Sequence, residues 1–153
     1  MTIVIAEERP DTPDAMQLIE ELEAHLTPLY PQESRHGLSV EKLLREGVHF
    51  FVTRQDGAPV GCGGIKLFDT EYGELKRMWV RPQARGSGLG KLMLNYLADF
   101  CRKRAITILR LETGIYQVEA IGLYEGFGFQ RRPPFGEYRE DPLSVFFEMR
   151  LNP

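Results

Sequence analysis

The sequence has few of the residues that hold metals or build disulfide frameworks. Its 153 residues include two cysteines, Cys62 and Cys101, and three histidines, His25, His36 and His49. The cysteines have no metal-ligand spacing and are too few for a disulfide framework, and the histidines are too scattered for a metal site. We therefore expect two free, buried thiols in a reducing compartment, and no metal cofactor.

Excess positive charge and long apolar runs are also missing. The formal net charge is −3, so the chain as a whole has no electrostatic footprint for nucleic acid. No apolar stretch approaches the roughly 20 residues that span a bilayer, and the acidic start, residues 1–8, does not resemble a signal peptide. No linker divides the chain. These features predict a single cytoplasmic domain over residues 1–153, without a nucleic-acid or membrane partner.

The pattern of apolar residues predicts an α/β fold. The central sheet is expected to be mixed, antiparallel in its first half and partly parallel in its second, with helices on both faces. A strong hairpin signal, Asp56-Gly57, lies between two of the early strands. The predicted strands are 3–6, 48–54, 60–68, 72–80, 108–113, 129–131 and 145–151. The predicted helices are 12–26, 39–46, 88–105 and 118–124.

The most informative stretch is a glycine-rich loop between the third strand of the meander and a long amphipathic helix. Its sequence is Arg85-Gly86-Ser87-Gly88-Leu89-Gly90-Lys91. The three glycines permit a tight turn with exposed backbone N–H groups. Together with the positive end of the following helix, these groups form an anion site, and the two cations extend it toward phosphate. The loop therefore predicts a phosphate-bearing ligand.

Two common nucleotide-binding motifs do not fit this loop. A Walker A loop has four residues between its glycines and Ser or Thr after the lysine, whereas Gly86 and Gly90 enclose three residues and Leu92 follows Lys91. The dinucleotide fingerprint is missed by one residue, and the loop follows an antiparallel meander instead of the first strand of a βαβ unit. The alternative without a ligand is a turn that only closes a strand–helix corner.

Three segments resemble the GCN5-related N-acetyltransferase (GNAT) superfamily. Arg85-Gly86-Ser87-Gly88-Leu89-Gly90 resembles its pyrophosphate loop, and Met78-Trp79-Val80-Arg81-Pro82 resembles its fourth strand and exit turn. Ala120-Ile121-Gly122-Leu123-Tyr124-Glu125-Gly126-Phe127-Gly128-Phe129 resembles its Leu-Tyr/Gly-Phe segment. The matches cover roughly residues 48–131. The resemblance implies an N-acetyltransferase with acetyl-coenzyme A (acetyl-CoA) as cosubstrate, acting by direct attack of an amine on the thioester.

The resemblance also implies which residues bind the cofactor. The pantetheine arm would lie where the strands ending at Val80 and Thr113 splay apart, paired with backbone groups of Met78 and Val80. The backbone N–H of Met78 or Trp79 would stabilise the oxyanion. Gln117 stands where the family commonly has asparagine, a departure that leaves its cofactor contact open. The pyrophosphate would be held by Arg85, Gly86, Ser87, Gly88, Leu89, Gly90 and Lys91.

Two side chains carry the implied chemistry. Tyr124 matches the tyrosine that in this family often faces the thioester sulfur, where a phenol could protonate the departing thiolate; the alternative is an ordinary core tyrosine. Glu74 matches the glutamate that some members use as general base. The alternative for Glu74 is a solvated or salt-bridged strand residue beside Lys76 and Arg77.

The acceptor is less well defined. Tyr30, Arg35, Phe135 and Tyr138 lie in loops that usually form the acceptor pocket of the family, and Lys76 shares a strand face with the candidate base. The cations suggest a small amine that also bears a carboxylate, although surface solvation explains them equally well. A protein or peptide acceptor and a noncatalytic acyl-CoA-binding sensor stay open as alternatives. Exposed strand edges would allow a homodimer.

Overall fold

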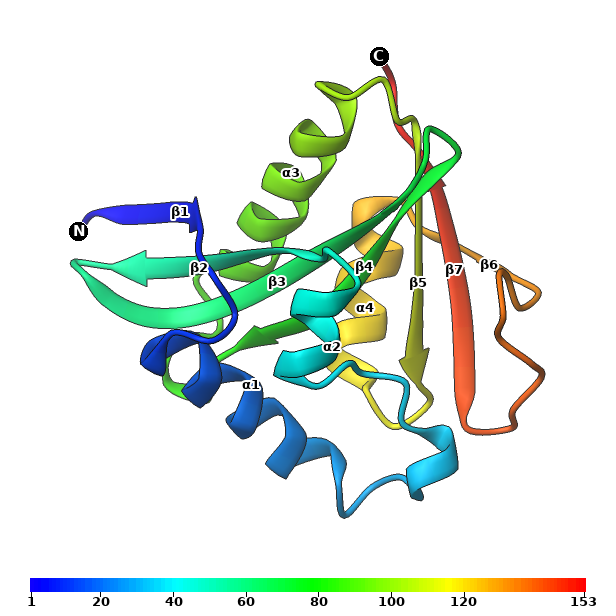
Figure 1. Ribbon diagram of the computed structural model, residues 1–153, viewed down its shortest axis with the longest axis horizontal. Helices are drawn as coiled ribbons and strands as arrows, with labels where there is room; N and C mark the ends of the chain where they lie inside the picture. The colour runs from blue at the N-terminus through cyan, green and yellow to red at the C-terminus, as the bar shows by residue number, and fades with distance from the viewer.

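The computed structural model describes all 153 residues and contains a mixed sheet of seven strands in the order β1-β2-β3-β4-β5-β7-β6 (Figure 1). The strands are β1 (Ile3–Glu7), β2 (His49–Gln55), β3 (Ala58–Phe68), β4 (Tyr72–Val80), β5 (Ile108–Gly114), β6 (Gln130–Arg132) and β7 (Ser144–Arg150). The helices are α1 (Pro13–Leu26), α2 (Val40–Arg45), α3 (Leu89–Arg102) and α4 (Val118–Phe127). Two short 3-10 turns cover Gln32–Ser34 and Pro82–Ala84. The predicted α/β class and mixed sheet are confirmed.

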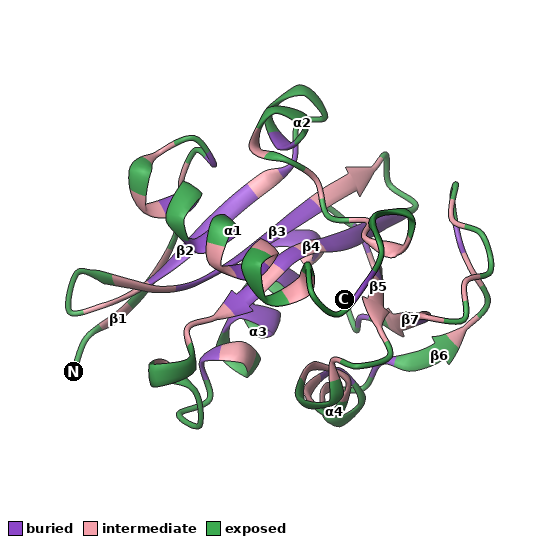
Figure 2. Cartoon of the chain, turned by 90° about the horizontal axis from the view of Figure 1, so that it is seen from below, coloured by how far each residue is buried: buried purple, intermediate pink, exposed green.

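Helices cover both faces of the sheet, as predicted. Helices α1 and α2 lie in front of the sheet in Figure 1, and α3 and α4 lie behind it; Figure 2 separates the two layers and shows the buried residues along β2, β3 and β4 between them. Successive side chains of β2 point to opposite faces of the sheet, so this strand contributes to the core on both sides. Phe50 and Val52 pack in the α1–α2 core, and Phe51 packs in the α3–α4 core.

The helix ends differ from the expected ones for local reasons. Thr12 and Ser39 cap α1 and α2 as predicted. Helix α3 ends at Arg102, before the expected boundary, and Ala105 then takes a left-handed conformation with φ of 60°. Helix α4 continues through Phe127 because its C-cap is Gly128, with φ of 123°. No helix is long and apolar enough to cross a membrane.

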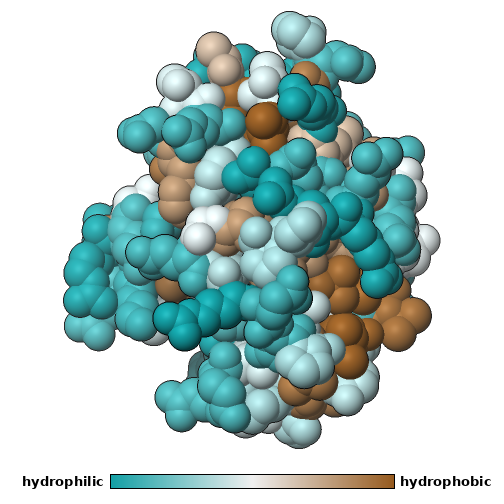
Figure 3. All heavy atoms as spheres, turned by 90° about the vertical axis from the view of Figure 1, so that its right-hand side faces the viewer, coloured by the Kyte–Doolittle hydropathy of each residue, from teal (hydrophilic) through white to brown (hydrophobic).

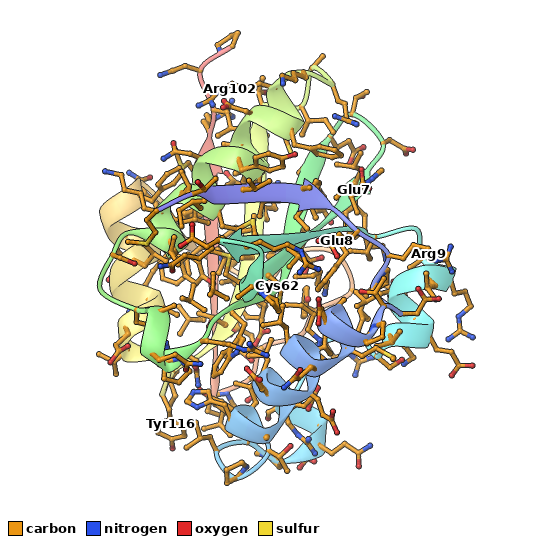
Figure 4. All side chains as sticks on the ribbon, turned by 90° about the vertical axis from the view of Figure 1, so that its left-hand side faces the viewer. Glu7, Glu8, Arg9, Cys62, Arg102 and Tyr116 are labelled. Carbon is orange, nitrogen blue, oxygen red and sulfur yellow. The ribbon has the colours of Figure 1, made fainter.

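Both cysteines are free and buried, as expected. Burial raises the pKa of the Cys62 thiol to about 12 and that of Cys101 to about 11. At neutral pH both side chains are therefore protonated thiols that contribute to packing. Cys62 lies in the interior in Figure 4.

The parallel part of the sheet is a single, short pair. Strands β4 and β5 pair in parallel only at Gly73 with Leu109 and at Glu74 with Arg110. Strand β7 then lies antiparallel to β5 and β6, so the second half is less parallel than a strand–helix–strand order suggests. In Figure 1, β4 and β5 run close together near the top and diverge toward their carboxyl ends. The sheet is therefore open on that side.

A β-bulge changes the alternation of β4 just beyond this pairing. Arg77 has φ of 53°, and the register between β3 and β4 shifts between Cys62 and Gly64. Two residues of β4 thus face one residue of β3. The consequence is that Leu75 packs in the α3–α4 core, whereas Trp79 packs in the α1–α2 core.

The segment between β6 and β7 is anchored by a third cluster of buried aromatic side chains. Tyr72, Phe135 and Phe146 form this cluster, and Tyr138 packs against it. The side of the molecule nearest β6 and β7 is mostly hydrophilic, with one hydrophobic area at lower right (Figure 3). Through Phe135 and Tyr138, residues 133–143 pack against the sheet beside the open side of β4 and β5. We call these residues the cover segment.

Candidate active site

Two cavities meet where β4 and β5 have separated. The larger, of about 460 Å³, lies among the end of β4, the glycine-rich loop and the start of α4. The smaller, of about 120 Å³, lies between β4, β5 and the chain that follows α1. They have a common wall, formed by Leu22, Met78, Gln117, Ala120 and Tyr124. Molecules bound in the two cavities would meet at this wall.

The glycine-rich loop shapes one end of the larger cavity. Gly86 and Gly88 have φ of 85° and 83°, a region that disfavours L side chains, and a Cβ on either glycine would point into open space. Gly88 is also the N-cap of α3 and offers no side chain to the first N–H groups of the helix. These N–H groups and the positive end of α3 are free to bind an anion.

Packing around the loop holds it in place. The guanidinium of Arg85 donates from Nε to the Val80 carbonyl at 2.9 Å and stacks on the Trp79 ring at 4.8 Å. Gly90 allows α3 to approach α4, because a Cβ there would come within 2.8 Å of Leu123. The loop is thus fixed to the end of β4 on one side and to α4 on the other.

The structure brings together nearly all the residues expected to bind the cofactor. Ser87 is the exception, since it lines neither cavity and its hydroxyl donates to the Ala84 carbonyl at 3.0 Å. Its side chain closes the turn. The expected residues that line the larger cavity are Met78, Trp79, Val80, Arg85, Gly86, Gly88, Leu89, Gly90, Lys91, Gln117 and Tyr124.

Gln117 and Tyr30 fix the segment that separates the two cavities. The Gln117 amide donates to the Tyr30 hydroxyl at 3.3 Å, and its Oε1 lies 3.2 Å from His25 Nε2. The same hydroxyl accepts from the Tyr116 backbone N–H at 3.0 Å. A Cβ on Gly114 would collide with the Tyr30 ring. Tyr30 therefore lines the smaller cavity but uses its hydroxyl to hold the start of α4, at the lower end of the molecule where Figure 4 labels Tyr116.

Tyr124 stands on the common wall with a free hydroxyl. Its ring is only 6% exposed and packs against Phe129 and Phe147. The hydroxyl forms no hydrogen bond with another residue of the chain, and Tyr124 is one of the residues that line both cavities. Burial, with a smaller contribution from Glu112, raises the pKa of the phenol well above its ordinary value. Tyr124 is thus a protonated donor at the meeting point.

Glu74 is buried, and its carboxylate is paired within the chain. Its Oε2 lies 3.0 Å from Lys76 Nζ and accepts a short hydrogen bond from the Tyr138 hydroxyl. Lys76 Nζ also donates to this hydroxyl at 2.8 Å. Burial and the adjacent Glu74 raise the pKa of Tyr138. All three residues line the smaller cavity, but Glu74 has the ion-paired arrangement that was the alternative to a catalytic role.

A second carboxylate of the smaller cavity, Glu112, was missed in the sequence. It projects from β5 and accepts a hydrogen bond from the Ser144 hydroxyl at 2.8 Å. Burial raises its pKa to about 7, a change that Ser144 and Lys76 only partly oppose. No cation lies within salt-bridge distance of it. The only signal in the sequence was a single carboxylate near the carboxyl end of the strand 108–113.

The expected acceptor residues are only partly assembled. Tyr30, Arg35, Lys76 and Tyr138 line the smaller cavity. Phe135 does not, because it is buried in the aromatic cluster against Tyr72 and Phe146. The expectation of a substrate contact for Phe135 is corrected accordingly: its ring supports the cover segment. Arg77, which was considered only as an ion-pair partner of Glu74, lines the cavity instead.

Comparison with known proteins gives one consistent family. The sequence pattern of the Acetyltransferase (GNAT) family matches residues 14–129. An IAA acetyltransferase of Azospirillum brasilense is 46% identical over 151 residues, which are 97% of this chain and 98% of that protein. A structure described as an acyl-CoA N-acyltransferase from Klebsiella pneumoniae has a TM-score of 0.83 and 36% identity, with 99% of each chain covered.

More distant structures have the same fold. The PaiA N-acetyltransferase of Thermoplasma acidophilum, solved in complex with coenzyme A, has a TM-score of 0.73. It is 19% identical and covers 98% of this chain and 99% of its own. At this identity the likeness concerns the fold.

Glu112 should make the stability of the protein depend on pH. Its pKa rises from 4.5 to about 7 on folding, so the folded protein retains a proton that the unfolded chain loses between these values. The free energy of unfolding therefore falls as pH rises from about 4.5 through 7. Glu112→Gln should remove this cost and raise the free energy of unfolding by about 3 kcal/mol at pH 8, with little change at pH 4.5.

Urea unfolding of wild type and variant at the two pH values tests this expectation. Glu119→Gln is the control, because that side chain is 88% exposed and its replacement should leave stability nearly unchanged at both pH values. Equal stabilities of wild type and Glu112→Gln at pH 8 would show that the carboxylate is not desolvated in the folded protein.

Proposed function

The chain belongs to the GNAT acetyltransferase family, and from this premise we propose that it transfers the acetyl group of acetyl-CoA to the amino group of a small molecule. The observation that carries this proposal is the common wall of the two cavities at Tyr124. A donor in the larger cavity and an acceptor in the smaller one would bring their reacting groups to the same place. The acetyltransferase name of the Azospirillum relative and the coenzyme A complex of the Thermoplasma neighbour support this assignment.

The residues of the larger cavity fit acetyl-CoA. An anion site at the start of α3 suits the pyrophosphate, and Arg85 and Lys91 supply positive charge beside it. The edge of β4 that faces away from β3, at Met78 and Val80, has no partner strand beyond Glu74 and would offer backbone groups to the amides of the pantetheine arm. When bound, acetyl-CoA supplies an acetyl thioester that is reactive toward an amine.

Glu112 in the smaller cavity and Tyr124 on the common wall would each transfer one proton in the reaction. An acceptor arrives as an ammonium group and must lose a proton before it attacks. Glu112 is placed in the smaller cavity and has a pKa near 7, so it can accept that proton at neutral pH. The Tyr124 phenol is protonated and free to donate a hydrogen bond or proton to the departing sulfur. A backbone N–H of Met78 or Trp79 stays our candidate for the oxyanion.

Glu112 is a better candidate for the base than Glu74. The carboxylate of Glu74 is held by Lys76 and Tyr138, so a proton taken from the acceptor would displace a buried ion pair. Glu112 has only the Ser144 hydroxyl as a side-chain partner. A base role for Glu74 remains a prediction from the family resemblance, and the two carboxylates can be told apart by mutation.

The small size of the acceptor cavity supports a small molecule over a peptide. The cavity measures about 120 Å³, and the cover segment bends over one side of it, where the Tyr138 hydroxyl reaches Glu74. A free hydroxyl on Tyr124 beside a carboxylate with a pKa near 7 supports catalysis over simple acyl-CoA sensing.

Cofactor binding should depend on Gly88. Gly88→Trp places a large side chain at the mouth of the anion site and should abolish acetyl-CoA binding in calorimetry. Gly57→Trp is a matched control, because Gly57 has nearly the same φ, 87°, and is also surrounded by open space, but lies in the β2–β3 hairpin. If Gly57→Trp binds acetyl-CoA like wild type and Gly88→Trp does not, the loop is the binding site. Unchanged binding by both variants would place the cofactor elsewhere.

The base should be identifiable from the pH dependence of turnover. With an amine that is acetylated, kcat/KM should rise with pH through an inflection near 7, because Glu112 must be deprotonated to act. Glu112→Gln should lower kcat by about 10²–10³-fold and remove the inflection. Glu74→Gln should keep it. Loss of the inflection in Glu74→Gln and its retention in Glu112→Gln would assign the base to Glu74.

A further inference from the structure

Two guanidinium groups of the smaller cavity share a single carboxylate. Arg77, from the bulge of β4, pairs through Nη2 with Glu23 Oε1 of α1, and Arg35 Nη1 lies 3.7 Å from the other oxygen of Glu23. Both arginines line the cavity. The single carboxylate of Glu23 thus lies beside two guanidinium groups, so this corner of the cavity has an excess of positive charge.

Each of these guanidinium groups also has a buried nitrogen without a partner. They are Arg35 Nε and Arg77 Nη1. The side chain of Arg77 is only 3% exposed, and its guanidinium occupies the space above Gly37, where a Cβ would collide with it. A buried N–H of a charged group without a hydrogen bond is costly. A carboxylate bound at this corner would offer acceptor oxygens to the two guanidinium groups.

The other basic groups of the cavity are not available for this role. Lys76 is held by Glu74 and Tyr138. His36 packs edge-on against the Tyr138 ring, and burial lowers its pKa, which favours the neutral imidazole. The spare positive charge therefore belongs to Arg35 and Arg77.

Of the two carboxylates that line the cavity, Glu74 pairs with Lys76 and Glu112 forms no salt bridge. The cavity thus has one pole that suits an ammonium group and another that suits an anion. The planar fork of a guanidinium matches a carboxylate in particular. We propose that the acceptor is a small amino carboxylate, whose carboxylate binds Arg35 and Arg77 while its amino group faces Glu112 and Tyr124. This inference rests on the proposed acetyl transfer and defines its substrate class.

The test is a matched panel of acceptors in an assay of thiol release from acetyl-CoA. Each amino acid is compared with its carboxamide and with the amine that lacks the carboxyl group. The amino acid should have a kcat/KM at least tenfold above both analogues. Arg35→Gln should lower kcat/KM for the amino acid by about 10- to 100-fold, mainly through KM, because charged hydrogen bonds are lost. It should change the rate with the carboxamide less than threefold.

Further variants separate recognition from folding. Arg77→Lys keeps the cation that pairs with Glu23 but removes the second nitrogen of the fork, and it should reduce the preference for the amino acid over its carboxamide. Arg150→Gln is the control, because that exposed residue lies at the end of β7 and should leave the preference intact. Thermal unfolding of each variant shows whether it is folded.

The outcomes distinguish this inference from the proposed function. If carboxamides or simple amines react as well as the amino acids, or if Arg35→Gln slows both equally, the carboxylate site is wrong and the transferase stands. If calorimetry shows acetyl-CoA binding but no amino acid in the panel is acetylated, the proposed substrate class is wrong, although the cofactor site stands. If acetyl-CoA does not bind, the proposed function itself fails.

Discussion

The early end of hydrogen bonding between β4 and β5 creates the space for the site. These strands pair with each other at only two positions, after which β4 stays paired only with β3 and β5 only with β7 toward their carboxyl ends. Backbone groups left without a partner strand must find other partners, and an extended ligand with amides is a suitable one. The free end of β4 leads directly into the glycine-rich loop and α3. The same divergence therefore positions both the strand edge and the anion site, and it opens the smaller cavity on the other side of Tyr124.

The bulge at Arg77 determines what lines that smaller cavity. A regular strand would turn Lys76 and Arg77 to opposite faces, but the extra residue places both on the α1 side, next to Glu23 and Tyr138. A non-glycine residue with positive φ costs on the order of 1–3 kcal/mol. Here the conformation is held by the ion pair with Glu23 and by a hydrogen bond from Arg77 Nε to the Leu38 carbonyl at 2.9 Å. Backbone strain is thus associated with the acceptor side of the site.

Local sequence patterns predicted most elements and the position of the glycine-rich loop before α3. The strand 72–80 has the expected bounds, and the glycine spacing predicted the open turn at the start of α3 because the turn and the helix start are both local features. The roles of acceptor residues depend on contacts between distant segments. Phe135 is buried between Tyr72 of β4, which lies far from it in sequence, and Phe146 of β7. Glu112 is significant only because β4 leaves β5 just before it, and no local pattern encodes that separation.

The most direct test is a crystal structure of the protein with coenzyme A bound. If the larger cavity holds the cofactor and the common wall is the place of reaction, the pyrophosphate will lie on the amides of residues 86–91. The thiol sulfur will then lie within hydrogen-bonding distance of the Tyr124 hydroxyl, facing the smaller cavity. A cofactor bound with its sulfur away from Tyr124, or outside the gap between β4 and β5, would contradict acetyl transfer at the common wall.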